Sequence, residues 1–345
     1  MASWPRIAAA ALGLAAALSQ PCPGFAQEVT LDIHHLLSSR APAQVAFLEP
    51  WARRIETQSD GRIAIDIYPD MELGGQPQQL YDQVVQGRVD IAWTVSGYTP
   101  GKFPRTEVFE LPFIHEKNAV ATNLAIQDVF DPYLAEDYTE VHPLLVHVHA
   151  GQAFDSAGQP VRSLDDLKGL RFRTPTRTGG WMLEAFGAKS VGMPVPALPL
   201  ALDKDIVDGA VIPYEIFPPL RLQEHVSAVT VGHDDRRFGT AVFIFIMNKQ
   251  VYEGLPPDLR QVIDANSGRN LAADIGQVWM DVETKASQFI ETSGVEMIEL
   301  SAEETDRLQR ASEPVIDRWI DDVASRGIDG RQLVQAAKEA ISRHQ

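Results

Sequence analysis

The 345-residue sequence is short of three things: cysteine, long apolar runs and positive charge. Its only cysteine is Cys22, so no disulfide can form within one chain. After the first 26 residues no segment approaches 18 uninterrupted apolar residues, the length that predicts a membrane-spanning helix. The sequence also lacks the G-x-S-x-G and H-E-x-x-H motifs, which leaves a hydrolase without a recognisable catalytic group.

The N-terminus has the pattern of an export signal rather than of a folded segment. Arg6 is its only charged residue, and the run Ile7–Leu18 has the length of a secretory hydrophobic region. Gly24-Phe25-Ala26 follows with small residues at both ends, so we expect cleavage after this alanine. Gln20-Pro21 fits poorly before a lipid-modified cysteine, and Cys22 is expected to leave with the signal. A mature chain without disulfides is permissible in an oxidising compartment when its core is large.

Acidic residues outnumber basic ones, 47 against 30, which gives a formal net charge of −17 at pH 7. Removing 26 residues from 345 leaves 319, and the loss of Arg6 takes the charge from −17 to −18. Such a surface repels nucleic acid and anionic lipid, so neither is expected as a partner. A length of 319 residues predicts two domains.

Apolar periods of two and of 3.6 residues alternate along the chain, as they do in layered α/β proteins. Strands are predicted at 29–34, 62–68 and 144–150. Helices are predicted at 43–58, 77–86 and 118–133. Pro50 should bend the first of these helices or mark a late start, because proline is poorly tolerated in a helix interior.

The later segments continue this alternation. Residues 163–169, "SLDDLKG", predict a one-turn helix with a capping box between Ser163 and Asp166, followed by the strand "LRFRT" and a helix at 179–188. The segment 241–248, "AVFIFIMN", is apolar on both faces, which predicts a central strand. Residues 259–291 predict one helix of roughly 50 Å, long enough to cross both domains. We find no flexible linker, so sheet segments are expected to join the domains.

The stretch "LKGLRFRTP" (167–175) concentrates positive charge in an acidic chain. On a strand, Arg171 and Arg173 lie on one face, and a solvated edge is the plain interpretation. Thr174-Pro175 ends the strand, however, and places Arg173 at its C-terminal end, where open α/β sheets bind ligands. An arginine fork matches a carboxylate in two hydrogen bonds. Spacing alone does not choose between Arg171, Arg173 and Arg177.

Six segments in this order resemble the solute-binding subunits of tripartite ATP-independent periplasmic (TRAP) transporters of the DctP type. They are "MELGGQPQQLYDQVVQGRVDIAW", "FELPF", "SLDDLKGLRFRTP", "FGAKSVGMPV", "DIVDGAVIPYE" and "MNKQVYEGLPPDLRQVID", and the resemblance covers essentially the whole mature chain. It implies that Arg173 forms the salt bridge with the substrate carboxylate, while Arg171 occupies an outward-facing position that is usually lysine.

The resemblance also implies the fold class: α/β, a two-lobed, type II-like periplasmic binding protein. Each lobe would be a mixed sheet flanked by helices, with a long helix crossing both. Lobe I would comprise 27–150 plus 240–278, and lobe II 151–239 plus 279–345.

One departure from the family pattern bears on the ligand. Where the family often has "DGAENP", this chain has "DGAVIP", so Ile212 replaces an asparagine that often contacts the ligand. An apolar residue there argues against sialic acid or a C4-dicarboxylate.

Further candidates for the binding site are aromatic or polar residues near predicted strand ends. Each aromatic could equally be a core residue, and Glu215 could accept a hydrogen bond from a ligand hydroxyl, pair with an arginine, or be a surface carboxylate. The candidates beside Arg173, Arg177 and Ile212 are Trp93, Tyr98, Trp181, Tyr214, Glu215 and His35.

The nine histidines include two close pairs, His34-His35 and His147-x-His149. Nothing supplies a third or fourth ligand at convincing spacing, so neither a transition metal nor another cofactor is expected.

The sequence thus predicts a periplasmic receptor rather than an enzyme. It would close two lobes around an organic acid, a hydroxy, keto or aromatic monocarboxylate, and deliver it as a monomer to the two membrane subunits of a TRAP transporter. C4-dicarboxylate binding by the same fold, or a role as a ligand-presenting sensor co-receptor, are the alternatives.

Overall fold

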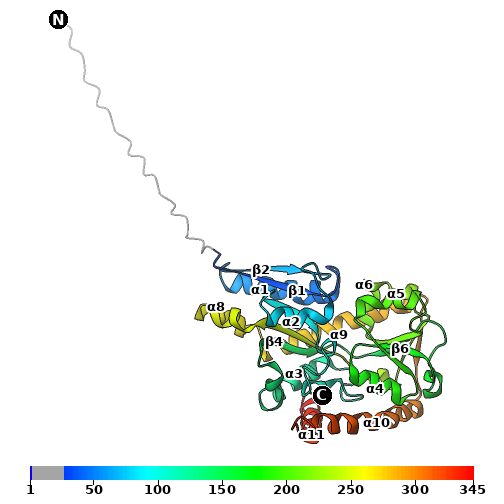
Figure 1. Cartoon of the computed structure of the whole chain (residues 1–345). Helices are drawn as coiled ribbons and strands as arrows, with labels where there is room; N and C mark the ends of the chain where they lie inside the picture. Colours follow the sequence, from blue (N-terminus) through cyan, green and yellow to red (C-terminus); the bar gives the residue numbers. More distant parts are fainter. Residues whose placement is uncertain (2–26) are drawn as a thin grey trace.

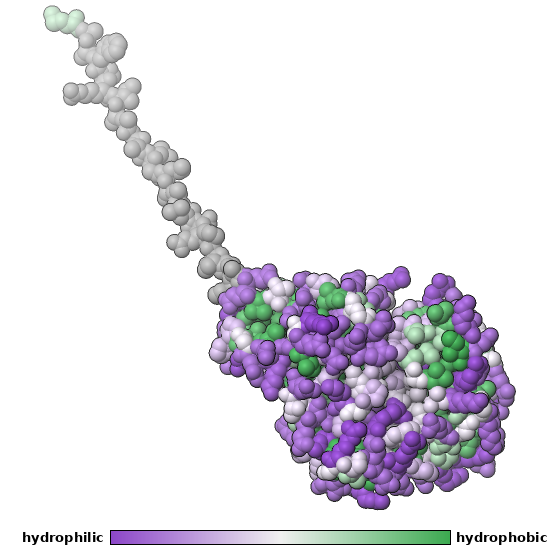
Figure 2. Space-filling view, viewed as in Figure 1, coloured by the Kyte–Doolittle hydropathy of each residue, from purple (hydrophilic) through white to green (hydrophobic). Residues whose placement is uncertain are grey.

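The computed structural model describes Met1 and residues 27–345. The predicted export signal and Cys22 lie outside this part of the chain. Two sheets, each flanked by helices, form two lobes that lie side by side (Figure 1). No helix of the described residues is both long and apolar enough to cross a membrane. Hydrophilic residues cover most of the face in Figure 2, as the excess of charged acidic side chains leads one to expect.

The first sheet has five strands in the order β2-β1-β3-β10-β4. Their bounds are β1 (Val29–His35), β2 (Ile63–Tyr68), β3 (Ile91–Val95), β4 (Val141–Val148) and β10 (Val242–Asn248). β1 runs parallel to β2 and β3, whereas β10 runs antiparallel to β3 and β4. Every residue of β10 is buried, so the segment with two apolar faces is a central strand as predicted.

The second sheet has six strands in the order β11-β9-β5-β8-β6-β7. Their bounds are β5 (Ala153–Ser156), β6 (Arg171–Thr174), β7 (Lys189–Gly192), β8 (Gly209–Ile212), β9 (Ala228–Val231) and β11 (Glu296–Glu299). β6 runs parallel to both its neighbours, β7 and β8. The C-terminal ends of β6 and β8 therefore lie at the same edge of the sheet.

Helices α1 (Glu49–Gln58), α2 (Leu80–Val85), α3 (Ala119–Val129), α7 (Lys249–Gly254) and α8 (Pro257–Ala265) accompany the first sheet. The helix predicted at 43–58 is present, because a π-helical turn, Ala43–Leu48, runs directly into α1. Pro50 therefore does not mark a late start but lies where the π-helical turn passes into α1. Asn118 caps α3 by accepting a hydrogen bond from the Ala121 amide.

Helices α4 (Arg177–Ala185), α5 (Leu198–Asp203), α6 (Phe217–Leu220) and α10 (Ala302–Ala324) accompany the second sheet. The capping box predicted at 163–166 does not form. Ser163 donates its hydroxyl to the Asp166 carboxylate over 3.0 Å, and that carboxylate accepts from the Arg162 amide instead. Only a short 3₁₀ turn, Leu164–Leu167, follows.

The single long helix predicted at 259–291 is broken. α8 ends at Ala265, and Gly268, with φ +54° and ψ −129°, precedes α9 (Arg269–Thr292). The side-chain amide of Asn266 donates back to the Val262 carbonyl over 2.8 Å, which favours termination at that point. The remaining 24 residues of α9 span about 36 Å.

Even so shortened, α9 crosses both lobes, since it contacts α3 and β4 of the first and the turn Tyr214–Ile216 of the second. The last helix, α11 (Gly330–His344), packs on α3. The sequence assigned residues 279–345 to lobe II, but α11, at the end of this segment, packs on the first lobe. The other lobe boundaries stay a prediction.

Two chain segments pass between the sheets beside each other: 149–152, after β4, and 239–241, before β10. The Gln152 amide donates to the Gly239 carbonyl over 2.9 Å, and the Phe238 amide donates to the Gln152 carbonyl over 3.2 Å. We call 149–152 and 239–241 the hinge segments. Gly151 has a φ of +103°, and a Cβ there would lie 2.6 Å from side-chain carbons of Arg237, so both backbone angle and space require glycine.

Candidate functional site

A small cavity of about 40 Å³ lies between the two sheets, beside the hinge segments. Five of the predicted site residues line it: Trp93, Tyr98, Arg173, Ile212 and Glu215. They come from both lobes, and α9 adds Trp279. A ligand in this cavity would therefore contact both lobes at once.

Arg173 lies near the C-terminal end of β6, and it is 2% exposed. Its Nε donates to the Met193 carbonyl over 2.9 Å, and Nη2 donates to the Tyr98 hydroxyl over 3.1 Å. Within the described residues no carboxylate oxygen lies within 4.0 Å of its nitrogens. Burial lowers the pKa of Arg173, but an arginine keeps its charge in a protein. The cavity thus contains a buried cation without a counter-charge.

Tyr98 follows β3 and carries its hydroxyl across to the second lobe. The oxygen accepts hydrogen bonds from Arg173 and from the Val195 amide, the latter over 2.9 Å. Because both bonds use the oxygen as acceptor, the phenolic proton is left to be donated into the cavity. The hydroxyl also ties the first lobe to Arg173.

Aromatic rings form one wall of the cavity. Trp93 stacks on Phe243 with ring centroids 4.6 Å apart and planes 8° apart, and Trp279 lies 6.2 Å from Trp93 at 20°. Both indole N–H groups lie 3.0 Å from nitrogens of His147. Burial lowers the pKa of His147 to about 3, and a neutral imidazole has one ring lone pair, so it accepts from one indole at a time.

His149 lines the cavity next to this wall. Its Nδ1 accepts from the Gly151 amide over 2.9 Å, and its Nε2 lies 3.3 Å from the Ala241 amide. Burial lowers the pKa of His149 well below its usual range, so the ring is neutral. It connects the two hinge segments to the cavity.

Glu215 extends from the turn that follows β8. It is 6% exposed, lines the cavity, and its Oε2 has no hydrogen-bond partner. Burial, and next the nearby Glu283 carboxylate, raise the pKa of Glu215 well above its usual range. The interpretation of Glu215 as a surface carboxylate is wrong.

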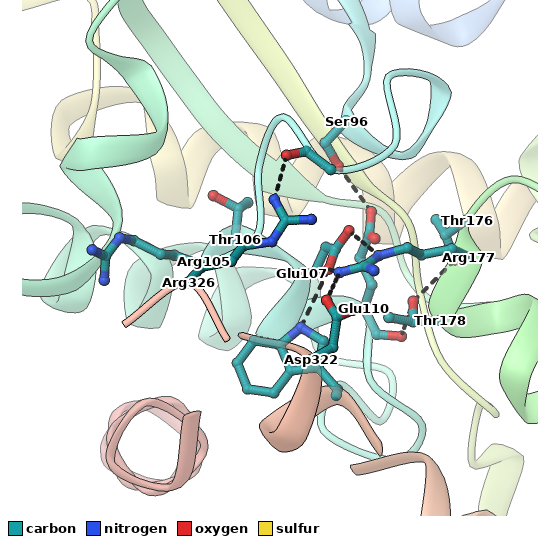
Figure 3. A network of polar contacts seen from close by, with 12 residues as sticks. Ser96, Arg105, Thr106, Glu107, Glu110, Thr176, Arg177, Thr178, Asp322 and Arg326 are labelled. Atoms are coloured by element: carbon teal, nitrogen blue, oxygen red, sulfur yellow. Dashed lines mark hydrogen bonds and ion pairs between the residues drawn. The ribbon is translucent and has the colours of Figure 1, made fainter. Parts of the chain in front are cut away.

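Arg177 does not line the cavity. At the start of α4 its guanidinium donates to Glu107 of the first lobe over 2.7 and 2.6 Å and to Asp322 of α10 over 2.8 Å (Figure 3). It also lies over the Trp181 ring, 4.9 Å from the centroid. Arg177 thus connects α4 to the first lobe and to α10, and Trp181, like Arg177, is not a lining residue of the cavity.

Two other candidates, His35 and Tyr214, also lie outside the cavity lining. His35 is buried edge-on to Trp93 at 6.5 Å and contacts Gln44, Nε2 to Oε1, over 3.0 Å. The Tyr214 ring lies under the guanidinium of Arg237 at 4.3 Å. His35 thus supports Trp93, which faces the cavity, whereas Tyr214 packs on Arg237, which is not a lining residue.

Arg171 is paired and partly exposed. Its Nη2 donates to Asp208 over 2.6 Å, and its Nε donates to the same carboxylate over 3.0 Å. This position matches the outward-facing one that the family resemblance implies.

Neither histidine pair gathers with a third possible metal ligand among the described residues. Among residues 27–345 one group of three possible metal ligands gathers, His233, Asp234 and Glu299, and all three are exposed. Neither His34-His35 nor the pair His147 and His149 belongs to it.

Sequence reasoning missed several lining residues, among them His149 as a cavity residue, Gln152, Phe243 and Trp279. Phe243 lies on the central strand whose two apolar faces were recognised, and Trp279 lies on a recognised helix. The apolar period of the strand or of the helix does not show which of its side chains line the cavity. Gln152 belongs to no motif or predicted element of the sequence.

The family model of bacterial extracellular solute-binding proteins, family 7 (DctP), matches residues 33–322. The chain belongs to this family. A marine metagenome TRAP solute-binding protein, described as specific for aromatic acid ligands and solved with 3-hydroxybenzoate, is 40% identical with a TM-score of 0.90, covering 92% of this chain and 99% of its own. A TRAP solute-binding protein from Rhodoferax ferrireducens T118, solved with copurified benzoate, is 37% identical with a TM-score of 0.89, covering 91% and 98%.

A curated relative from Comamonas testosteroni, the "Outer membrane transporter protein TsaT", is 27% identical over 321 residues, 91% of this chain and 92% of its own length. The expectation of a DctP-type TRAP solute-binding protein is therefore confirmed, and so is the two-lobed α/β fold class. Members of the DctP family are solute receptors, so this chain is a binding protein and not an enzyme.

Proposed function

We propose that this DctP-family protein is an extracytoplasmic receptor for an aromatic monocarboxylate, whose carboxylate pairs with Arg173. The observation that carries the proposal is the buried guanidinium without a carboxylate partner. A buried charge needs a counter-charge, and an arginine fork suits a carboxylate. The Tyr98 proton is a second donor for the same anion.

The remaining lining favours an apolar ligand body with one charge. Trp93, Phe243 and Trp279 offer ring faces, and Ile212 is 1% exposed and apolar. A second carboxylate would lose its hydration without gaining a partner at Ile212, at a cost of several kcal/mol. The two structural relatives above were solved with a hydroxybenzoate and with benzoate, each of which has one carboxylate.

Lobe closure would accompany binding. The carboxylate is shielded only when Tyr98 of the first lobe meets Arg173 of the second, so the ligand binds the closed form better and shifts the population towards it. The paired hinge segments and α9 are the parts of the chain that both lobes share.

The setting of this receptor follows from the sequence and the family. Residues 1–26 would direct export to the periplasm, and the loaded monomer would deliver its ligand to the two membrane subunits of a TRAP transporter. No cofactor enters this account.

A thermal-shift panel on refolded, ligand-free protein tests the proposal. Benzoate and the hydroxybenzoates should raise the melting temperature, since a ligand at 100 times its Kd adds about 2.7 kcal/mol to the stability. A panel in which succinate or malate stabilises the protein more than every monocarboxylate would instead support a C4-dicarboxylate receptor, as in the Rhodobacter capsulatus relative named for that ligand class.

A further inference from the structure

The cavity contains a second unpaired polar group, the carboxyl of Glu215. Its Oε2 is buried without a partner, while Arg173 approaches the same cavity from a different strand. A buried polar atom without a hydrogen bond is destabilising unless something bound there supplies one. The cavity is thus built for two polar contacts, at Arg173 and at Glu215.

The charge state of Glu215 follows from its neighbour on α9, Glu283. Glu283 accepts from the amides of Tyr214 (3.1 Å) and Glu215 (3.0 Å) and pairs with Arg237 over 2.7 Å. Arg237 also pairs with Asp235 over 3.1 Å. The cation beside Glu215 is therefore already matched by two carboxylates.

An ionised Glu215 would be a further buried negative charge beside Glu283, with no cation left to neutralise it. Such a group takes up a proton rather than remain charged, and burial together with Glu283 raises the pKa of Glu215 accordingly. A protonated carboxyl has one O–H to donate, which an ionised one lacks. Glu283 is within hydrogen-bonding reach of Glu215, so a ligand oxygen competes with Glu283 for this donor.

We propose that Glu215 is a specificity-determining residue that donates a hydrogen bond from an un-ionised carboxyl to an oxygen substituent on the ligand, a hydroxyl or a keto oxygen. This inference rests on the proposed function, in which Arg173 holds the carboxylate. Arg173 on β6 and the turn after β8 hold the two contacts at a fixed separation, so one substituent position on an aromatic ring is favoured. Glu283 is the positioning residue, since it fixes the backbone of that turn.

Calorimetry with benzoate and the three hydroxybenzoates tests the contact. The proteins compared are the full-length wild type and its Glu215→Gln and Glu215→Leu variants. Glu313→Leu serves as the control, because Glu313 is an exposed residue on α10. The wild type should bind its preferred hydroxybenzoate about tenfold more tightly than benzoate. Glu215→Gln retains a donor and should keep this preference, whereas Glu215→Leu should abolish it, read within each variant as the ratio of the hydroxybenzoate Kd to the benzoate Kd. Glu313→Leu should behave as the wild type.

Infrared difference spectroscopy tests the protonation state independently of any ligand. The wild type minus Glu215→Gln spectrum at neutral pH should contain the carbonyl band of a protonated carboxyl. A carboxylate band in its place, or a hydroxybenzoate preference that Glu215→Leu leaves unchanged, would overturn the inference while benzoate binding still upheld the proposed function. A wild type that binds none of the four ligands would fail the proposed function, and the infrared result would still report on Glu215.

Discussion

Three arginines lie within seven residues, Arg171, Arg173 and Arg177, and they differ in their carboxylate partners. Arg171 pairs with Asp208 at a partly exposed position, and Arg177 has two carboxylates, Glu107 and Asp322. Arg173 alone of the three has none in the described part of the chain. The sequence could predict that one of the three binds an anion, and family resemblance selected Arg173. The partners of Arg177 lie 70 and 145 residues away, so no local pattern could predict them.

Arg177→Ala should therefore impair stability rather than ligand binding. It leaves Glu107, whose side chain is 7% exposed, without its cation, and removal of one partner of a buried pair costs about 3 kcal/mol. Urea denaturation measures the loss, and calorimetry with benzoate should show an unchanged Kd. Arg318→Ala is the matched control, because Arg318 also lies over Trp181 but its pair with Glu184 is exposed. A large loss of affinity with little loss of stability would place Arg177 in the binding site.

At the scale of helices and strands, the elements predicted from apolar periods are present, but the sequence missed what depends on distant contacts. The central position of β10 follows from its two apolar faces. The break between α8 and α9 does not follow from the apolar pattern, because the 3.6-residue period continues through 266–268 while local hydrogen bonds and Gly268 end the helix. The return of α11 to α3 depends on long-range packing that no period reports.

Asp128 of α3 is the polar link in that packing. It accepts from Arg343 (3.1 Å) and His344 (2.8 Å) of α11 and from Arg269 of α9. Burial alone would raise its pKa, but the hydrogen bonds from His344, Arg269 and Arg343 outweigh burial and lower the pKa to about 2. Because this folded-state pKa lies below the ordinary 3.8, the link stabilises the fold above about pH 4 and is lost as the pH falls towards 2.

Asp128→Asn should accordingly lower the free energy of unfolding at neutral pH and flatten its decline between about pH 4 and pH 2. Urea titrations over this range measure the effect. Asp131→Asn, a nearby exposed aspartate, serves as the control and should leave the profile unchanged. Identical pH profiles for Asp128→Asn and the wild type would show that the link does not hold α11 in place.

At the scale of the whole molecule, two lobes share a cavity, two hinge segments and α9. Chain length predicted two domains and composition predicted an acidic surface, but neither predicts where the cavity lies, since its lining comes from both sheets and from α9. Closure about the hinge should reduce the radius of gyration when ligand binds. Small-angle X-ray scattering with and without saturating benzoate measures the change, and superimposable curves would contradict a two-lobe closing mechanism.

The pairing of Arg173 with a ligand carboxylate is the central claim, and calorimetric titration of benzoate into the wild type, Arg173→Ala and Arg171→Ala tests it most directly. Loss of one partner of a desolvated charge pair costs about 2 to 5 kcal/mol, so Arg173→Ala should weaken binding roughly 30- to several-thousand-fold with the fold intact by circular dichroism. Arg171→Ala should bind nearly as the wild type does, because its partner is Asp208 at the surface. Benzoate binding that survives in Arg173→Ala, or that is lost in Arg171→Ala instead, would contradict the account.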